Sequence, residues 1–111
     1  MSMMDGLELV HSFIVVAEEL NFRRSAERLH LDQSALSRRI QKLEQFLGFS
    51  LLERTTREVS LTPAGRTFYN DNKSLLGNYA RSVEVAQAVA RGHSGVNVIK
   101  IADRQFQIVY L

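Results

Sequence analysis

The segment 33–42 carries the side chains best suited to chemistry with a macromolecule. Gln33 can pair bidentately with adenine, and Arg38 can pair bidentately with guanine. Ser34 and Ser37 are short enough to let a backbone approach closely. At helical spacing these four residues share one face, and a DNA major groove admits one helix. We therefore predict that Gln33, Ser34, Ser37 and Arg38 contact base edges.

Cationic side chains around this face are suited to DNA phosphates. Arg39 and Lys42 lie towards the flanks of the same predicted helix. Arg23 and Arg24 come early in the preceding helix, where they would contact the opposite wall of the groove. Arg54 ends a short strand that follows. The predicted phosphate contacts are therefore Arg23, Arg24, Arg39, Lys42 and Arg54.

A short hairpin is predicted after these helices. Residues 51–54 and 59–61 are strand candidates, and residues 55–58 can form the tip between them. Thr56 and Arg57 at this tip could reach the adjacent minor groove, where a narrow A·T-rich stretch attracts arginine. Since an isolated two-stranded hairpin is only marginally stable, we expect it to pack against the helices.

Three helices must position these residues. Apolar side chains at spacings of three and four predict helices over residues 7–20, 22–29 and 33–47. Asn21 and Asp32 are suitable N-caps for the second and third helices. Gly48 is suited to ending the third in a left-handed conformation. The buried stripe predicted for the third helix is Leu36, Ile40, Leu43 and Leu47, with Phe46 beside it. Two helices joined by a tight turn, the second cationic outward, form a helix-turn-helix.

A long helix is predicted over residues 63–91, about 40 Å in length. Thr62 is a suitable cap and Pro63 suits the first helical position. Residues along this helix step by three and four: Tyr69, Asn72, Leu76, Tyr79, Val83, Ala86 and Ala90. A helix of this length cannot bury the stripe against so small a domain. We therefore predict a homodimer or higher homo-oligomer, with an interface formed by Tyr69, Leu76, Tyr79, Val83, Ala86 and Ala90.

Composition and charge narrow the function classes. The chain has 111 residues and no cysteine, which excludes disulfides and thiolate metal sites. No signal-like start and no apolar run long enough to span a membrane is found, so a cytoplasmic location is predicted. The net charge is only +2, but the first 20 residues hold four acidic and no basic residues, whereas residues 23–42 hold six basic and two acidic ones. Such a polarised surface is typical of nucleic-acid binding.

Enzymatic chemistry is not indicated. The separations of His11, His30 and His93 fit no metal-ligand spacing, and no carboxylate pair is placed for acid–base work. Gly92-x-x-Gly95 lacks the lysine and hydroxyl residue that a phosphate loop requires. A small enzyme is therefore disfavoured, and neither a metal nor a cofactor is predicted.

The motifs also resemble a known family. They are Phe22-Arg23-Arg24-Ser25-Ala26-Glu27-Arg28-Leu29, Gln33-Ser34-Ala35-Leu36-Ser37-Arg38-Arg39-Ile40, Leu43-Glu44, Leu47-Gly48, Leu51-Leu52-Glu53-Arg54 and Leu61-Thr62-Pro63-Ala64-Gly65. In order and spacing, over about residues 7–91, they resemble the N-terminal domain of LysR-type transcriptional regulators. The resemblance implies a winged helix-turn-helix, a linker helix that pairs antiparallel with a second protomer, and dyad-symmetric bacterial promoter DNA as partner. It places Gln33, Ser34, Ser37 and Arg38 at bases, and Arg54 and Arg57 in the wing.

The chain departs from the family pattern in composition and length. Arg23 stands where the family usually has a small hydroxyl residue, and Ser25-Ala26 stands where it usually has two alanines. Position 34, which is serine here, is often proline in the family. Members of the family also carry a much longer C-terminal domain that binds a small effector. Residues 95–102 resemble the start of its first strand, so we expect the effector site to be incomplete in this chain, either as a domain piece or as a truncated product.

Together these observations predict a mainly α fold: a three-helix winged helix-turn-helix with a two-stranded β-wing, followed by a long linker helix. The expected divisions are a DNA-binding domain over residues 1–62, a dimerisation helix over 63–91 and the start of an effector domain over 92–111. The predicted function is DNA-binding transcriptional regulation. Two alternatives stay open: a MarR-like winged-helix dimer, with dimer helices at both chain ends, and an interaction module that pairs with full-length regulators.

Overall fold

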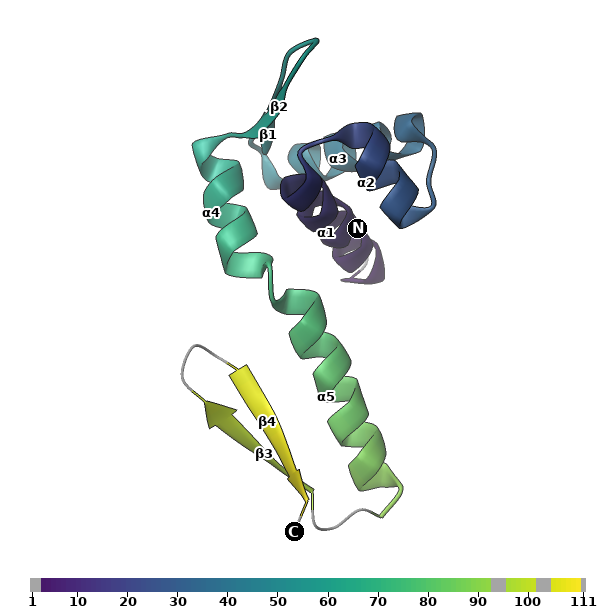
Figure 1. Ribbon diagram of the computed structural model, residues 1–111, viewed down its shortest axis with the longest axis vertical. Coiled ribbons are helices and arrows are strands. Elements are labelled where there is room, and N and C mark those ends of the chain that lie inside the picture. Colours follow the sequence, from purple (N-terminus) through teal and green to yellow (C-terminus); the bar gives the residue numbers. More distant parts are fainter. Residues whose placement is uncertain (1–2, 93–95, 102–104, 111) are drawn as a thin grey trace. The chain divides into compact units, whose positions relative to one another are not determined.

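The computed structural model describes the backbone of residues 3–92, 96–101 and 105–110, and the side chains of residues 6–92. The chain divides into two compact units, residues 1–74 and 75–111, which are described separately. The first unit contains α1 (Met3–Glu19), α2 (Phe22–Leu29), α3 (Gln33–Leu47), β1 (Leu52–Arg54), β2 (Val59–Leu61) and α4 (Pro63–Asn72) (Figure 1). This order confirms the predicted winged helix-turn-helix, and α2 and α3 have the predicted bounds.

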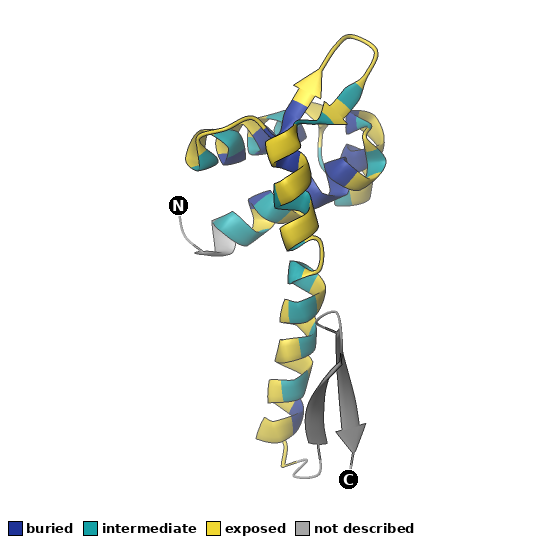
Figure 2. Ribbon diagram, turned by 90° about the vertical axis from the view of Figure 1, so that its left-hand side faces the viewer, coloured by how far each residue is buried: buried dark blue, intermediate teal, exposed yellow. Residues whose placement is uncertain are grey.

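The core of the first unit lies where α1, α2 and α3 meet. Phe13 of α1 and Leu36 and Ile40 of α3 are fully buried, and Figure 2 shows this buried interior. Phe68 and Tyr69 of α4 pack against the same cluster. The rings of Phe13 and Phe68 lie 5.8 Å apart. α4 therefore belongs structurally with the winged helix-turn-helix.

The ends of α2 and α3 follow local capping rules, except that the N-cap of α3 makes no side-chain hydrogen bond. The Asn21 side chain accepts a 2.9 Å hydrogen bond from the backbone N–H of Arg24, as expected for an N-cap. Gly48 ends α3 with φ of 84°, also as predicted. Asp32 occupies the N-cap position of α3, but its side chain makes no capping hydrogen bond. The predicted N-cap position is thus confirmed, and Asp32 acts there through its backbone carbonyl, which accepts from Leu36 N–H at 3.0 Å.

The wing is joined to α3 and α4 at its base. One oxygen of the Glu44 carboxylate accepts hydrogen bonds from the backbone N–H groups of Leu51 and Leu52, at 2.6 and 3.3 Å. Thr62 caps α4 by accepting from Gly65 N–H at 2.9 Å, and its hydroxyl donates to the Ser50 carbonyl at 2.6 Å. These contacts hold the base of the hairpin between two helices.

The wing itself is a tight antiparallel hairpin. Arg54 pairs with Val59 and Leu52 pairs with Leu61. At the tip, the Thr55 hydroxyl accepts hydrogen bonds from the backbone N–H groups of Arg57 and Glu58, at 3.2 and 3.0 Å. The predicted strands and tip are thereby confirmed, and the Thr55 side chain organises the turn.

The second unit contains α5 (Leu75–Ala90), β3 (Val96–Ile101) and β4 (Gln105–Tyr110). The strands pair antiparallel, from Val96 with Tyr110 to Ile101 with Gln105. β3 agrees with the strand predicted after Gly95, although Ala102 lies outside the described residues. No strand was predicted over residues 105–110, because their apolar residues have no clear period.

Two further expectations need correction. The helix predicted over residues 63–91 is present as two helices, α4 and α5, with a turn at residues 73–74. Asn72 contributes to this interruption, because it is a poor helix former and its side chain donates to the Phe68 carbonyl at 2.9 Å. Phe46 does not accompany the buried stripe of α3: it is 64% exposed, because its position on the helix turns it away from α1 and α2.

Candidate nucleic-acid interface

A surface groove runs between the start of α2, the start of α3 and the wing. Its lining residues come from all three elements: Leu20, Asn21, Phe22, Arg23, Gln33, Ser37, Arg54, Thr55, Thr56, Arg57, Glu58 and Val59. Two predicted base contacts, two predicted phosphate contacts and both predicted wing residues therefore share one concave surface. This is the arrangement needed for a helix and a hairpin to contact one duplex.

The residues predicted to contact bases lie on one open face of α3. Gln33, Ser34 and Arg38 are exposed, and Ser37 is half-buried. Leu36, on the other face, is fully buried. The buried face fixes α3 in the core, so the polar face is held outward on a rigid element.

Arg54 is held between α2 and α3. Its guanidinium carbon lies 4.1 Å from the centre of the Phe22 ring. Its Nη1 donates a 3.3 Å hydrogen bond to the Ser37 hydroxyl. The structure therefore brings a predicted phosphate contact beside a predicted base contact.

The other predicted phosphate contacts differ in their partners. Arg23 forms an exposed ion pair with Glu27 at 3.3 Å. Arg39 donates to the Ser12 hydroxyl at 3.2 Å and lies 3.8 Å from the Glu8 carboxylate, so it joins α3 to α1. The remaining two, Arg24 and Lys42, are exposed.

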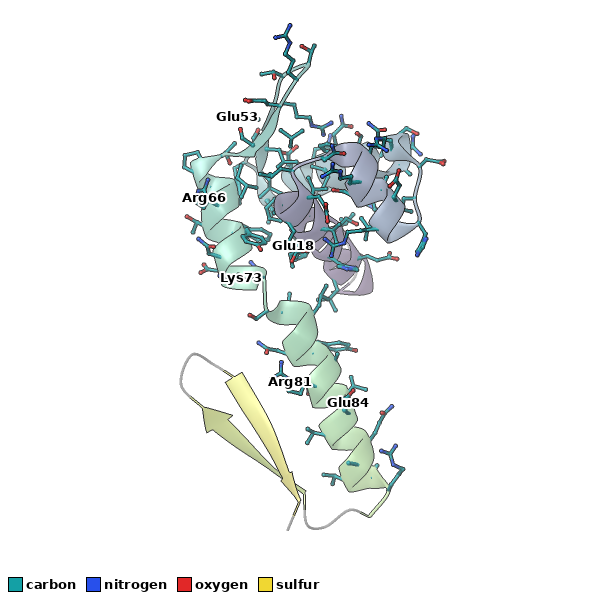
Figure 3. All side chains as sticks on the ribbon, in the orientation of Figure 1. Glu18, Glu53, Arg66, Lys73, Arg81 and Glu84 are labelled. Atoms are coloured by element: carbon teal, nitrogen blue, oxygen red, sulfur yellow. The ribbon has the colours of Figure 1, made fainter. Side chains whose placement is uncertain are left out.

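Arg28, which was not predicted to contact DNA, forms ion pairs with Glu18 and Glu19, both at 3.0 Å. Hydrogen bonds with Glu19 and then Glu18 raise the pKa of the Arg28 guanidinium above its ordinary value. Glu18 is labelled in Figure 3 on α1. Acidic residues of α1 therefore engage the cation in the last turn of α2, and Arg28 is not one of the residues that line the groove.

Five of the six predicted dimer residues belong to α5. Tyr79 and Val83 are 54% and 37% exposed, Ala86 and Ala90 are exposed, and Leu76 is half-buried. Val89, which the heptad pattern did not include, is 58% exposed. The sixth predicted residue, Tyr69, lies on α4 and packs against the core of the first unit.

The structure describes the side chains of residues 6–92. Within that part of the chain, no group of three or more His, Asp or Glu residues is arranged to hold a metal ion. None of the helices there has the length and apolar character needed to cross a bilayer.

The contact between Phe22 and Arg54 could not be predicted from the sequence. Phe22 is an apolar residue of α2 and is buried. No local signal marks its contact with Arg54, because the two residues are far apart in the sequence and only the folded wing brings them together.

The fold and this surface define a winged helix-turn-helix DNA-binding domain. The profile of the family described as "Bacterial regulatory helix-turn-helix protein, lysR family" matches residues 7–66. The chain therefore belongs to the lysR family of bacterial regulatory helix-turn-helix proteins, and its N-terminal part is a LysR-type DNA-binding domain. This membership confirms the resemblance and disfavours the MarR-like alternative.

Named relatives agree with this membership. The chain is 45% identical over 95 residues to the HTH-type transcriptional regulator AlsR of Bacillus subtilis, covering 84% of this chain and 32% of the relative. It is 47% identical over 83 residues to TfdT of Cupriavidus pinatubonensis, covering 75% of this chain and 36% of the relative. The chain thus spans about a third of the length of these curated relatives. Both are transcriptional regulators by name.

Solved structures include close matches to the domain. The DNA-binding domain of BenM in complex with catB site 1 DNA is 41% identical, with a TM-score of 0.74, over 78% of this chain and 94% of that chain. The complex of the CbnR DNA-binding domain with DNA is 40% identical, with a TM-score of 0.71, over 76% of this chain and 97% of that chain. Both matched domains were solved bound to DNA.

Proposed function

We propose that this chain binds dyad-symmetric promoter DNA in a sequence-specific manner and thereby regulates transcription. α3 enters the major groove, and the wing reaches the neighbouring minor groove. The observation that carries the proposal is one groove lined by residues of three elements: Arg23 of α2, Gln33 and Ser37 of α3, and Arg54 and Arg57 of the wing. DNA complexes of the similar BenM and CbnR domains support it.

The proposed contacts divide into three kinds. Gln33, Ser34, Ser37 and Arg38 read base edges, because they lie on the outward face of α3. Five cations contact phosphates and fix the register of the domain on DNA: Arg23, Arg24, Arg39, Lys42 and Arg54. For two of them, DNA competes with existing partners, namely Glu27 for Arg23 and the α1 residues for Arg39. Thr56 and Arg57 contact the minor groove.

We further propose that the chain acts as a homodimer through α5. The supporting observation is the exposed apolar side chains Tyr79, Val83 and Val89, because a large exposed apolar surface is typical of an interface. A dimer would fix the separation of two recognition helices and so select the spacing of the DNA half-sites. No enzymatic step is needed for this function, and we place it on DNA in the bacterial cytoplasm, in keeping with its relatives.

Replacing one arginine of each kind tests the division of roles. We expect Arg38→Ala to reduce the preference for operator over random DNA by about 5-fold to 150-fold, because a good bidentate base contact contributes about 1–3 kcal/mol of discrimination. Arg54→Ala should weaken binding to both DNAs, lose less of the preference than Arg38→Ala, and lower the slope of log affinity against log salt by about one.

Fluorescence anisotropy with a promoter fragment next to the chain's own gene, and with a shuffled duplex, measures both effects. Lys73→Ala is the matched control, since Lys73 is exposed beyond the end of α4 and lines no part of the groove (Figure 3). If Arg38→Ala lowered the affinity for both duplexes equally, Arg38 would not be a base contact. A wild-type chain without preference for any promoter fragment would refute sequence-specific binding.

A further inference from the structure

We propose that Phe22 is a positioning residue of the DNA interface. Its ring holds the Arg54 guanidinium against the Ser37 hydroxyl, so that Arg54 and Ser37 meet DNA as one pre-formed set of hydrogen-bond donors. This inference rests on the proposed DNA-binding function and adds to it a residue that does not itself contact DNA.

The Arg54 guanidinium lies over the face of the Phe22 ring. The Arg54 guanidinium carbon lies 4.1 Å from the centre of the Phe22 ring, well within the distance at which a ring face attracts a cation. The ring is only 8% exposed and belongs to the core cluster, whereas Arg54 is exposed. Packing in the core therefore holds the Phe22 ring in place, and the ring in turn restrains the Arg54 side chain.

Contacts with Phe22 and Ser37 restrict the conformations of the Arg54 side chain. A free arginine side chain samples many rotamers, and ordering it on binding lowers affinity. Here the guanidinium is restrained on one side by Phe22 of α2 and on another by Ser37 of α3, which accepts from Nη1 at 3.3 Å. Much of the ordering that DNA binding requires is thus already present in the free domain.

The hydrogen bond from Arg54 also affects which DNA atoms the Ser37 hydroxyl can bind. A serine hydroxyl has one proton to donate and two lone pairs that can accept. Since Arg54 already donates to the Ser37 oxygen, the hydroxyl proton is directed to a different acceptor. Ser37 therefore favours acceptor atoms on DNA, such as guanine O6 or N7, thymine O4 or a phosphate oxygen.

A double-mutant cycle on the full chain tests the assignment. Phe22→Leu keeps an apolar core side chain but removes the ring face, and it should weaken operator binding about threefold to tenfold when Arg54 is present. In the Arg54→Ala background the same change should have almost no effect. Phe13→Leu is the matched control, because Phe13 is also a buried core phenylalanine but contacts Phe68. Its effect should be the same in both backgrounds.

A second measurement needs no DNA. The Arg54 side-chain Nε–H signal in a ¹H–¹⁵N spectrum of the free chain should be displaced by the ring current of Phe22. It should move towards the position of an unrestrained arginine in Phe22→Leu and stay in place in Phe13→Leu. Circular dichroism checks that each variant is folded, and Phe22→Met replaces Phe22→Leu throughout if the latter is not.

The outcomes are distinct. Coupling between Phe22 and Arg54 in affinity, together with the displaced Nε–H signal, supports the inference. Equal losses from Phe22→Leu with and without Arg54, or an Arg54 signal indifferent to the ring, overturn it. If the wild-type chain does not prefer operator DNA, the proposed function fails, and the spectrum of the free chain alone then decides whether Phe22 orders Arg54.

Discussion

At the scale of single residues, Gly65 shows how closely two segments approach. A Cβ atom built on Gly65 would overlap the carbonyl oxygen of Leu51 and crowd the rest of that backbone unit. Since backbone atoms cannot rotate away as a flexible side chain can, no other residue fits this position without a shift of α4 or the wing. Glycine is required here because the backbones of α4 and Leu51 approach closely. It is not required for its backbone conformation, since Gly65 lies within a regular helix.

We expect Gly65→Ala to lower the free energy of unfolding by about 1–3 kcal/mol or more, because the added methyl group overpacks the contact with Leu51. Gly77→Ala is the control. Gly77 is an exposed helical glycine whose Cβ would meet nothing closer than 3.8 Å, so alanine should stabilise α5 by about 0.5–1 kcal/mol. Urea denaturation followed by circular dichroism measures both, and a loss for Gly77 as large as that for Gly65 would contradict the explanation.

Residues whose roles are local could be predicted from the sequence. Asn21 and Gly48 act at helix ends through their own neighbours, so their residue types were sufficient. Phe22 and Glu44 could not be assigned in this way. Their partners, Arg54 for one and the backbone of Leu51 and Leu52 for the other, are brought close only by the packing of the wing on the helices.

At the scale of elements, Glu44 connects α3 to β1. Its carboxylate satisfies two backbone N–H groups that begin the wing, in a partly buried setting. An unsatisfied buried donor carries a desolvation cost of about 1–3 kcal/mol. Glu44 is therefore one of the side chains that fix the position of the wing relative to α3, beside Thr62 and Arg54.

We expect Glu44→Ala to destabilise the fold by about 1–3 kcal/mol, because it leaves the N–H groups of Leu51 and Leu52 without their acceptor. Glu44→Gln should lose less, since its amide oxygen still accepts. Thermal unfolding measures the difference, with the exposed neighbour Gln45→Ala as the control. The same loss for alanine and glutamine would show that charge, not acceptance, is what matters.

The break between α4 and α5 shows the limit of reading apolar spacing alone. The heptad pattern runs through Asn72 without interruption, and so it predicted a single helix. Helix propensity in the same stretch is poor, and the structure has a turn at residues 73–74. Periodicity reports which side of a helix is apolar, whereas continuity depends on the backbone preferences of each residue.

At the scale of the whole molecule, the proposed dimer leads to a direct prediction. Val83 is 37% exposed on α5 and lies on the heptad stripe, so Val83→Asp should leave the chain folded. The buried, unpaired charge should weaken dimerisation by at least about 100-fold. Sedimentation equilibrium measures the change. Ala80→Asp adds the same charge at an exposed position of α5 off the stripe, one heptad before the polar Gln87, and should leave the dimer intact. A Val83→Asp dimer as tight as wild type would rule out this face.

The attachment of α4 has a mechanical consequence. Thr62 donates through its backbone N–H to the Leu51 carbonyl at 3.0 Å and through its hydroxyl to Ser50, and Gly65 rests on Leu51. A rotation of α4 would therefore pull on the Ser50–Leu51 backbone, to which its first turn is joined by hydrogen bonds and close packing. Since β1 begins at Leu52 and ends at Arg54, α4 and this strand form a lever whose far end lies in the groove between α2, α3 and the wing.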